Sequence, residues 1–164
     1  MIQTQVRIRT PCETDTEAVR AFFAGLSANS QYQRFFTGLG SVSPSLVRDL
    51  TAVTPRQQVV LAIVGPDVVG HAMTATNKDG AIELGVVVAD GRRNEGIGTL
   101  LVRTLIERAV LGGGGRLRFD VLCENRFVLD WIRRGLPGTR FERDGYTLSG
   151  SAPLTLELVA TPAA

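Results

Sequence analysis

The residues best suited to bind an anion lie in a short turn, residues 93–98, with the sequence RNEGIG between a predicted strand and a predicted helix. The first N–H groups of a helix have no partner within the helix, and the helix dipole adds positive potential there. Gly96 and Gly98 carry no Cβ, so a phosphate can approach this backbone closely. The turn therefore predicts a phosphate site at the start of a helix.

Two common phosphate-binding motifs are excluded by residue type. A P-loop requires Lys followed by Ser or Thr after its glycines, and the only lysine of the chain, Lys78, lies elsewhere. A dinucleotide-binding fingerprint requires a third glycine where this chain has Leu101. The pattern that remains is Arg-x-x-Gly-x-Gly after a valine-rich strand.

This turn resembles the acetyl-CoA motif of the GNAT-type N-acetyltransferases, and further segments are similar to the GNAT domain of bacterial protein lysine acetyltransferases. The resemblance extends from Val6 to Leu158. Its ordered matches at family-like spacing favour this fold. The matching segments are Leu26-Ser27 with Ser30, Tyr32 and Arg34-Phe35-Phe36; Ile82-Glu83 with Val86-Val87-Val88-Ala89-Asp90; and Val121-Leu122 with Glu124-Asn125.

The resemblance implies an α/β fold with a mixed (α+β) sheet, mostly antiparallel, splayed and flanked by helices on both faces. It also implies one acetyl-CoA-binding domain over residues 1–164, of which 159–164 are expected to be a flexible tail. In the family the pantetheine arm lies in the splay and pairs with strand backbone, and the turn holds the pyrophosphate. Acetyl-CoA is then the acetyl donor, and no metal is needed. The residues implied to bind it are Val86, Val87, Val88, Arg93, Asn94, Glu95, Gly96, Ile97, Gly98, Thr99 and Asn125.

Several of these residues have an equally good structural explanation. The three valines fit the core of a strand, although their backbone could still pair with the donor. Asn125 is placed to cap the helix that follows it, which would account for it without a ligand. Arg92 and Arg126 are conceivable partners for the 3′-phosphate of the donor.

Glu83 is the candidate catalytic base. A lysine-type amine has a pKa of about 10.4, so it arrives charged and must lose a proton before it attacks a thioester. Glu83 interrupts an apolar strand at a position where the resembling enzymes carry Glu. Burial there would favour proton uptake. The alternative is a strand-end carboxylate that faces water or pairs with an arginine.

The general acid is where the sequence departs from the family. Many members carry a Tyr seven residues after the Asn, and this chain has Ile132 at that position. Tyr146, Cys123 or an ordered water could replace it, although spacing supports none of them. The single histidine, His71, lies on a predicted strand and is interpreted as structural. Phe127, Val128, Trp131 and Ile132 follow helical spacing and are expected in the core.

The elements that must position these residues follow from hydrophobic periodicity and turn signals. Four glycines at 112–115 predict a left-handed end to the helix before them. Gly38 and Gly40 predict a mobile loop. Strands are expected at 6–9, 59–64, 69–76, 82–88, 117–122, 140–144 and 155–158, the last two as a hairpin, and helices at 13–26, 30–36, 44–50, 97–110 and 125–134.

Composition excludes several functional classes. The 164 residues are 44% hydrophobic and 21% charged with a net charge of +2, which is ordinary for a globular protein and disfavours a nucleic-acid binder. No apolar stretch approaches the roughly 18–20 residues that span a membrane. The N-terminus has no apolar signal core, and Cys12 and Cys123 form no pattern. We expect a cytoplasmic protein with free thiols, without membrane or nucleic-acid partners.

Together the residues and the resemblance predict an acetyl-CoA-dependent N-acetyltransferase that acts by direct transfer in a ternary complex. A protein lysine is the favoured acceptor amine, and a small-molecule amine is the alternative. A catalytically silent acyl-CoA-binding module is an alternative of a different class. Both a monomer and a homodimer are compatible with the sequence.

Overall fold

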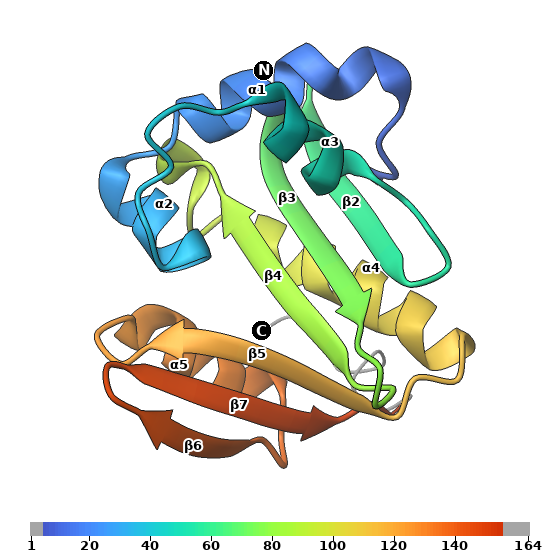
Figure 1. Ribbon diagram of the computed structural model, residues 1–164, viewed down its shortest axis with the longest axis vertical. Coiled ribbons are helices and arrows are strands. Elements are labelled where there is room, and N and C mark those ends of the chain that lie inside the picture. The colour runs from blue at the N-terminus through green and yellow to red at the C-terminus, as the bar shows by residue number, and fades with distance from the viewer. Residues whose placement is uncertain (1–4, 156–164) are drawn as a thin grey trace.

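The computed structural model describes residues 5–155 (Figure 1). Within this range seven strands form one sheet in the order β1-β2-β3-β4-β5-β7-β6. Every neighbouring pair is antiparallel except β4 and β5, which are parallel. The strands are β1 (Arg7–Arg9), β2 (Gln57–Val64), β3 (Asp67–Thr76), β4 (Ile82–Val88), β5 (Arg116–Leu122), β6 (Arg140–Asp144) and β7 (Thr147–Pro153).

Helices cover both faces of this sheet, which confirms the predicted architecture (Figure 1). The first three helices pack with β2, β3 and β4 through a core that contains Phe23, Val47 and Leu61. The last two pack on the opposite face, where Val102 and Leu129 share one core with Leu117. The helices of the described range are α1 (Thr16–Ala24), α2 (Ala28–Phe35), α3 (Pro44–Thr51), α4 (Ile97–Leu111) and α5 (Arg126–Gly135), with 3-10 turns at Glu13–Asp15 and Asp90–Arg92.

The sheet is splayed between β4 and β5. These strands pair only at Ile82 with Leu117 and at Glu83 with Arg118, and Figure 1 shows them separating toward α2. Residues 84–88 of β4 therefore pair with β3 on one edge, and on the other edge they have no strand partner among residues 5–155. A free strand edge of this kind presents backbone N–H and C=O groups to whatever lies in the gap.

Glycines fix how α4 sits on the sheet and where it ends. A Cβ at Gly70 of β3 would lie 2.9 Å from Leu101, so only glycine lets the helix approach this closely. At the other end, Gly113 has φ +81°, and the Gly113 and Gly114 N–H groups donate to the Val110 and Ala109 carbonyls. This is a Schellman ending, and it confirms the predicted left-handed termination.

The C-terminal hairpin differs from the prediction. Strand β6 pairs with β7, Thr147–Pro153, through a turn in which Gly145 has φ +57°, and Thr155 lies beyond that strand. The rest of the expected strand 155–158 and the tail 159–164 lie outside the described residues. Strand β7 carries small and polar residues instead of an apolar alternation, because the Phe119 ring covers Gly150, where a Cβ would lie 2.1 Å from the ring.

Candidate active site

A cleft of about 1610 Å³ opens where β4 and β5 separate. It is lined by β4 and β5, by the turn before α4, by the start of α5 and by the end of α2, together with residues of β3, β6 and β7. The tertiary structure thus brings segments that are far apart in the chain to one concave surface. The predicted residues that line it are Glu83, Val86, Val87, Val88, Arg93, Asn94, Gly96, Ile97, Gly98, Thr99 and Asn125.

The turn before α4 has the geometry of a phosphate cradle. Asn94 (φ +65°) and Gly96 (φ +77°) both adopt the left-handed conformation, which turns successive N–H groups toward one side. Helix α4 begins at Ile97 with no side-chain cap, and a Cβ built on Gly96 would meet nothing within 4 Å. The residues present therefore fit a phosphate group. Glu95 does not line the cleft, and its carboxylate pairs at 2.9 Å with Arg92, which does line it.

The three predicted valines serve the core and the cleft together. Val87 is buried against the helices of one face, and Val86 and Val88 pack partly buried against the other. Their backbone belongs to the β4 edge that has no strand partner beyond Glu83. Side chains and main chain thus have separate roles, so the two interpretations of these valines are compatible.

The Arg93 side chain lies in a hydrogen-bond network and holds the turn against α2. Its guanidinium donates to the Ser30 hydroxyl at 2.6 Å and lies 3.5 Å from the Asp90 carboxylate. Asp90 also accepts hydrogen bonds from the Ser30 hydroxyl and from the backbone N–H of Ser27 at 2.9 Å. Although partial desolvation raises the pKa of Asp90, these hydrogen bonds outweigh it and lower the pKa. The sequence singled out these residues separately and gave no signal that they meet.

Glu83 lies at the end of the cleft where β4 and β5 are still paired. Its carboxylate accepts a hydrogen bond from the Asn77 amide at 2.7 Å, and its side chain is exposed. Of the two interpretations of Glu83, burial in the strand is wrong, and the carboxylate faces water at the strand end as the alternative described. Asn77 was missed, since an Asn in a hairpin turn has a sufficient local explanation.

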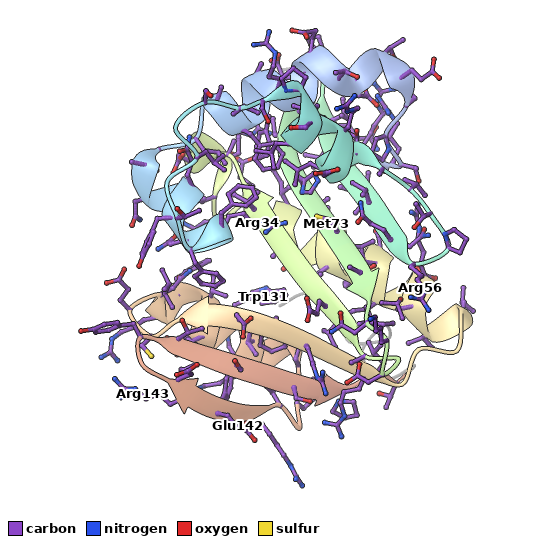
Figure 2. The ribbon with its side chains drawn as sticks, viewed as in Figure 1. Arg34, Arg56, Met73, Trp131, Glu142 and Arg143 are labelled. Carbon is purple, nitrogen blue, oxygen red and sulfur yellow. The ribbon has the colours of Figure 1, made fainter. Side chains whose placement is uncertain are left out.

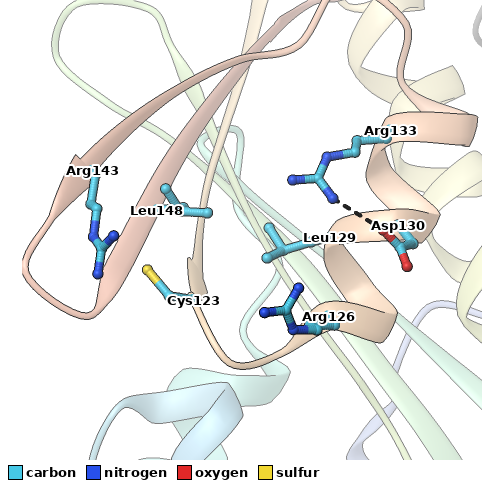
Figure 3. Close-up of a pocket in the computed structure, with 7 residues that line it drawn as sticks. All are labelled: Cys123, Arg126, Leu129, Asp130, Arg133, Arg143 and Leu148. Carbon is cyan, nitrogen blue, oxygen red and sulfur yellow. Dashed lines mark hydrogen bonds and ion pairs between the residues drawn. The ribbon is translucent and has the colours of Figure 1, made fainter.

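Neither of the two side chains considered as general acids, Tyr146 and Cys123, lines the cleft, whereas Ile132, at the family's tyrosine position, does. Ile132 is 3% exposed and lines the wall, whereas Tyr146 is 85% exposed and lies outside. Cys123 lines a separate pocket of about 360 Å³ with three arginines of α5 and β6 (Figure 3). Within residues 5–155, neither a tyrosine nor a cysteine lines the cleft.

The first turn of α5 and the start of α4 meet at the cleft wall. Asn125 accepts the N–H of Val128 at 3.3 Å, so its predicted capping role is confirmed, and it lines the cleft as well. The Trp131 indole N–H donates to the Thr99 hydroxyl at 2.9 Å, which leaves the hydroxyl hydrogen of Thr99 free to donate. Trp131 is half-buried and lines the cleft, and Phe127 is 59% exposed, so the expectation that Phe127 is in the core is wrong.

His71 has a structural environment, away from the cleft. Its Nε2 donates to the Leu50 carbonyl at 2.7 Å, and its ring packs edge-on against Phe23. Burial is the main cause that lowers the pKa of His71 to about 4; the nearby Arg34 charge acts in the same direction, and the Leu50 hydrogen bond opposes both. The imidazole is therefore neutral at pH 7, and its buried Nδ1 has no hydrogen-bond partner in the described part of the chain.

Residues 5–155 hold no cluster of three or more His, Cys, Asp or Glu side chains placed to bind a metal ion. None of the helices in this range is long and apolar enough to cross a membrane.

The structure is an α/β domain with a splayed, mostly antiparallel sheet and a turn before α4 that fits a phosphate group. Residues 26–136 match the model of the acetyltransferase (GNAT) family, so the chain belongs to that family. The family uses acetyl-CoA as donor and amines as acceptors.

Solved structures show the same fold. The GNAT domain of S. lividans PAT is 19% identical with a TM-score of 0.83, over 91% of this chain and 90% of that one. The ribosomal-protein-S18-alanine N-acetyltransferase of Escherichia coli is 14% identical with a TM-score of 0.71, over 92% and 95%. A GCN5-related N-acetyltransferase of Kribbella flavida is 20% identical with a TM-score of 0.71, over 91% and 98%.

Proposed function

We propose that the chain moves the acetyl group of acetyl-CoA directly to a primary amine within a ternary complex. The observation that carries this proposal is the continuity of one cleft. The cleft runs from the cradle at Gly96, along the unpaired edge of β4, to Glu83. A donor held by its pyrophosphate at one end would have its thioester arm along the β4 backbone. The amine would then enter beside Glu83.

Glu83 is proposed to remove the proton that a lysine-type amine carries. Such an amine has a pKa of about 10.4, so a base in hydrogen-bond reach is needed before it can attack. Asn77 holds the Glu83 carboxylate through one oxygen and leaves the other free to accept the proton, directly or through a water. A backbone N–H of the free β4 edge is proposed to stabilise the oxygen that gains charge during transfer.

No protein acid is needed in this proposal. The residue at the tyrosine position, Ile132, cannot donate a proton. A thiol has a pKa of about 8.5, so its thiolate leaves far more readily than an amine would. Water at the open end of the cleft can supply the proton after the bond to sulfur has broken.

A protein lysine is the proposed acceptor, and a small-molecule amine is the second choice. Two neighbours in fold support a protein acceptor by name, the GNAT domain of a PAT and the ribosomal-protein-S18-alanine N-acetyltransferase. The apolar Ile132 favours a second candidate function, an acyl-CoA-binding module without turnover. That module would share the cradle and the free strand edge, but Glu83 would have no role in it.

The test compares Glu83→Gln with Glu107→Gln, a change at an exposed carboxylate of α4 outside the cleft. Acetyl-CoA binding is measured by calorimetry, and turnover by release of the CoA thiol with a panel of amines and lysine peptides. We expect all three proteins to bind acetyl-CoA equally and Glu83→Gln alone to lose at least ~100-fold in kcat. Binding without turnover by the wild type would favour the silent module, and no binding would refute both functions.

A further inference from the structure

Arg34, near the end of α2, has no anionic partner among the described residues. Its guanidinium lies over Gly85 of β4, where a Cβ would come within 2.7 Å of Arg34 Cζ. Within residues 5–155 no carboxylate lies within ion-pair distance of it, and its Nε is buried without a hydrogen-bond acceptor. The cation does contact the Phe35 ring, whose centroid is 4.7 Å from Cζ.

This arrangement is unfavourable for the free protein. Desolvation lowers the pKa of Arg34 to about 10, and the environment provides no compensating negative charge. Carboxylates such as Glu83 do line the same cleft, but among residues 5–155 none of them forms an ion pair with Arg34. Figure 2 shows Arg34 where α2 meets β4, close to Met73, whose strand position pairs with Gly85. A half-buried guanidinium whose Nε has no acceptor within residues 5–155 can bind a carboxylate.

The position of Arg34 places it at the reacting end of the cleft. Gly85 lies between Val86, one of the proposed backbone contacts of the donor arm, and Glu83, the proposed base. Residues two apart on a strand share a face and are roughly 6.6 Å apart. Gly85 and Glu83 therefore face the same side. If an acceptor molecule places its amine near Glu83, a second group on the same molecule would therefore lie within reach of Arg34.

We propose that Arg34 binds a carboxylate that the acceptor carries close to its reacting amine. This inference rests on the proposed function and specifies its acceptor. The carboxylate would form a bidentate ion pair with the guanidinium, and this pair would hold the amine between Glu83 and the acetyl group. Two sources supply the same chemistry, the α-carboxylate of a free amino acid and an acidic side chain beside a lysine in a peptide.

Paired acceptors separate these two sources. L-lysine is compared with L-lysinamide, and a blocked Glu-Lys dipeptide is compared with a blocked Gln-Lys dipeptide. Each is assayed with wild-type protein, with Arg34→Gln and with Arg56→Gln, which removes an exposed arginine remote from the cleft (Figure 2). Arg34→Lys retains the positive charge but cannot form a bidentate pair with a carboxylate. Binding of each acceptor to CoA-saturated and to free protein is measured by calorimetry beside turnover.

The wild type is expected to favour the carboxylate-bearing member of one pair at least tenfold in KM, and Arg34→Gln to abolish this preference with acetyl-CoA affinity unchanged. Arg56→Gln should behave as wild type and Arg34→Lys should be intermediate. Arg34→Gln is also expected to unfold at the same temperature as the wild type or at a higher one, because it removes a desolvated charge. If the role of Arg34 were structural, its removal would instead lower the unfolding temperature. The acceptor pair that shows this Arg34-dependent preference identifies the carboxylate as that of a free amino acid or that of a neighbouring acidic side chain.

Equal binding of both members of each pair by the wild type would overturn the proposal. So would an equal loss for both members in Arg34→Gln, which would indicate a general structural role. Arg34-dependent preference for succinyl-CoA over acetyl-CoA would assign the carboxylate to the donor and refute an acceptor site. Failure of the proposed function would give a different result, because turnover would then be absent for every amine. Calorimetric binding of the paired acceptors to the free protein would still decide whether Arg34 binds a carboxylate.

Discussion

Replacement of Gly96 by Glu tests the phosphate cradle directly. Gly96 has φ +77° and opens the turn to the cleft, and a Cβ added at this position would meet no protein atom within 4 Å. Any L-residue there adopts a left-handed conformation at a cost of about 1–2 kcal/mol. For a chain of this size each kcal/mol lowers Tm by about 2–4 °C. Gly96→Ala therefore measures the backbone cost alone.

The glutamate adds an electrostatic penalty that alanine lacks. Two unit charges about 5 Å apart repel by about 3 kcal/mol at an effective dielectric constant near 20. That energy corresponds to a loss of about 100-fold or more in affinity for a ligand with a pyrophosphate. The new carboxylate could also accept the open N–H groups at the start of α4, which would occupy the cradle itself.

Calorimetric titration with acetyl-CoA at low and at moderate salt provides the assay. Gly96→Glu should bind at least ~100-fold more weakly than Gly96→Ala at low salt, with a smaller difference as screening increases. Thermal unfolding should show similar losses for both variants. Equal affinities of the two variants would refute the placement of the pyrophosphate at this turn.

Three further outcomes follow from the structure. Because burial lowers the pKa of His71 to about 4 from 6.5, the unfolded chain binds the extra proton in this window. The contribution of neutral His71 to the free energy of unfolding should be complete above about pH 6.5 and fall by about 3 kcal/mol toward pH 4. Urea unfolding of the wild type and of His71→Gln at several pH values measures this loss. Parallel pH profiles of the two proteins would contradict it. Asp90→Asn should cost about 1 kcal/mol, since one acceptor of a partly exposed network is lost, whereas the exposed Asp130→Asn should leave Tm nearly unchanged. Gly85→Ala should displace Arg34 and raise KM for the acceptor with acetyl-CoA affinity unchanged, and an unaltered KM would place the acceptor elsewhere.

Much of the fold was predictable because its signals are local. The valine-rich apolar runs of β2 to β4, the glycines after α4 and the cap at Asn125 are read from a few neighbouring residues. Strand β7 was missed for the opposite reason. Its small residues are explained by the Phe119 ring of the adjacent strand, a contact between residues 31 apart that leaves no periodic signal in β7 itself.

The amino-acid sequence alone determined the chemistry of the turn at Gly96, because the open N–H groups and the missing Cβ atoms belong to consecutive residues. The tertiary structure decided which side chains share that site. Arg93 meets Ser30 across 63 positions, and Arg34 lies over Gly85 from another element. It also left Glu83 exposed where apolar neighbours in sequence had indicated burial. Solvent exposure and charge pairing depend on what packs nearby in space, which no single segment specifies.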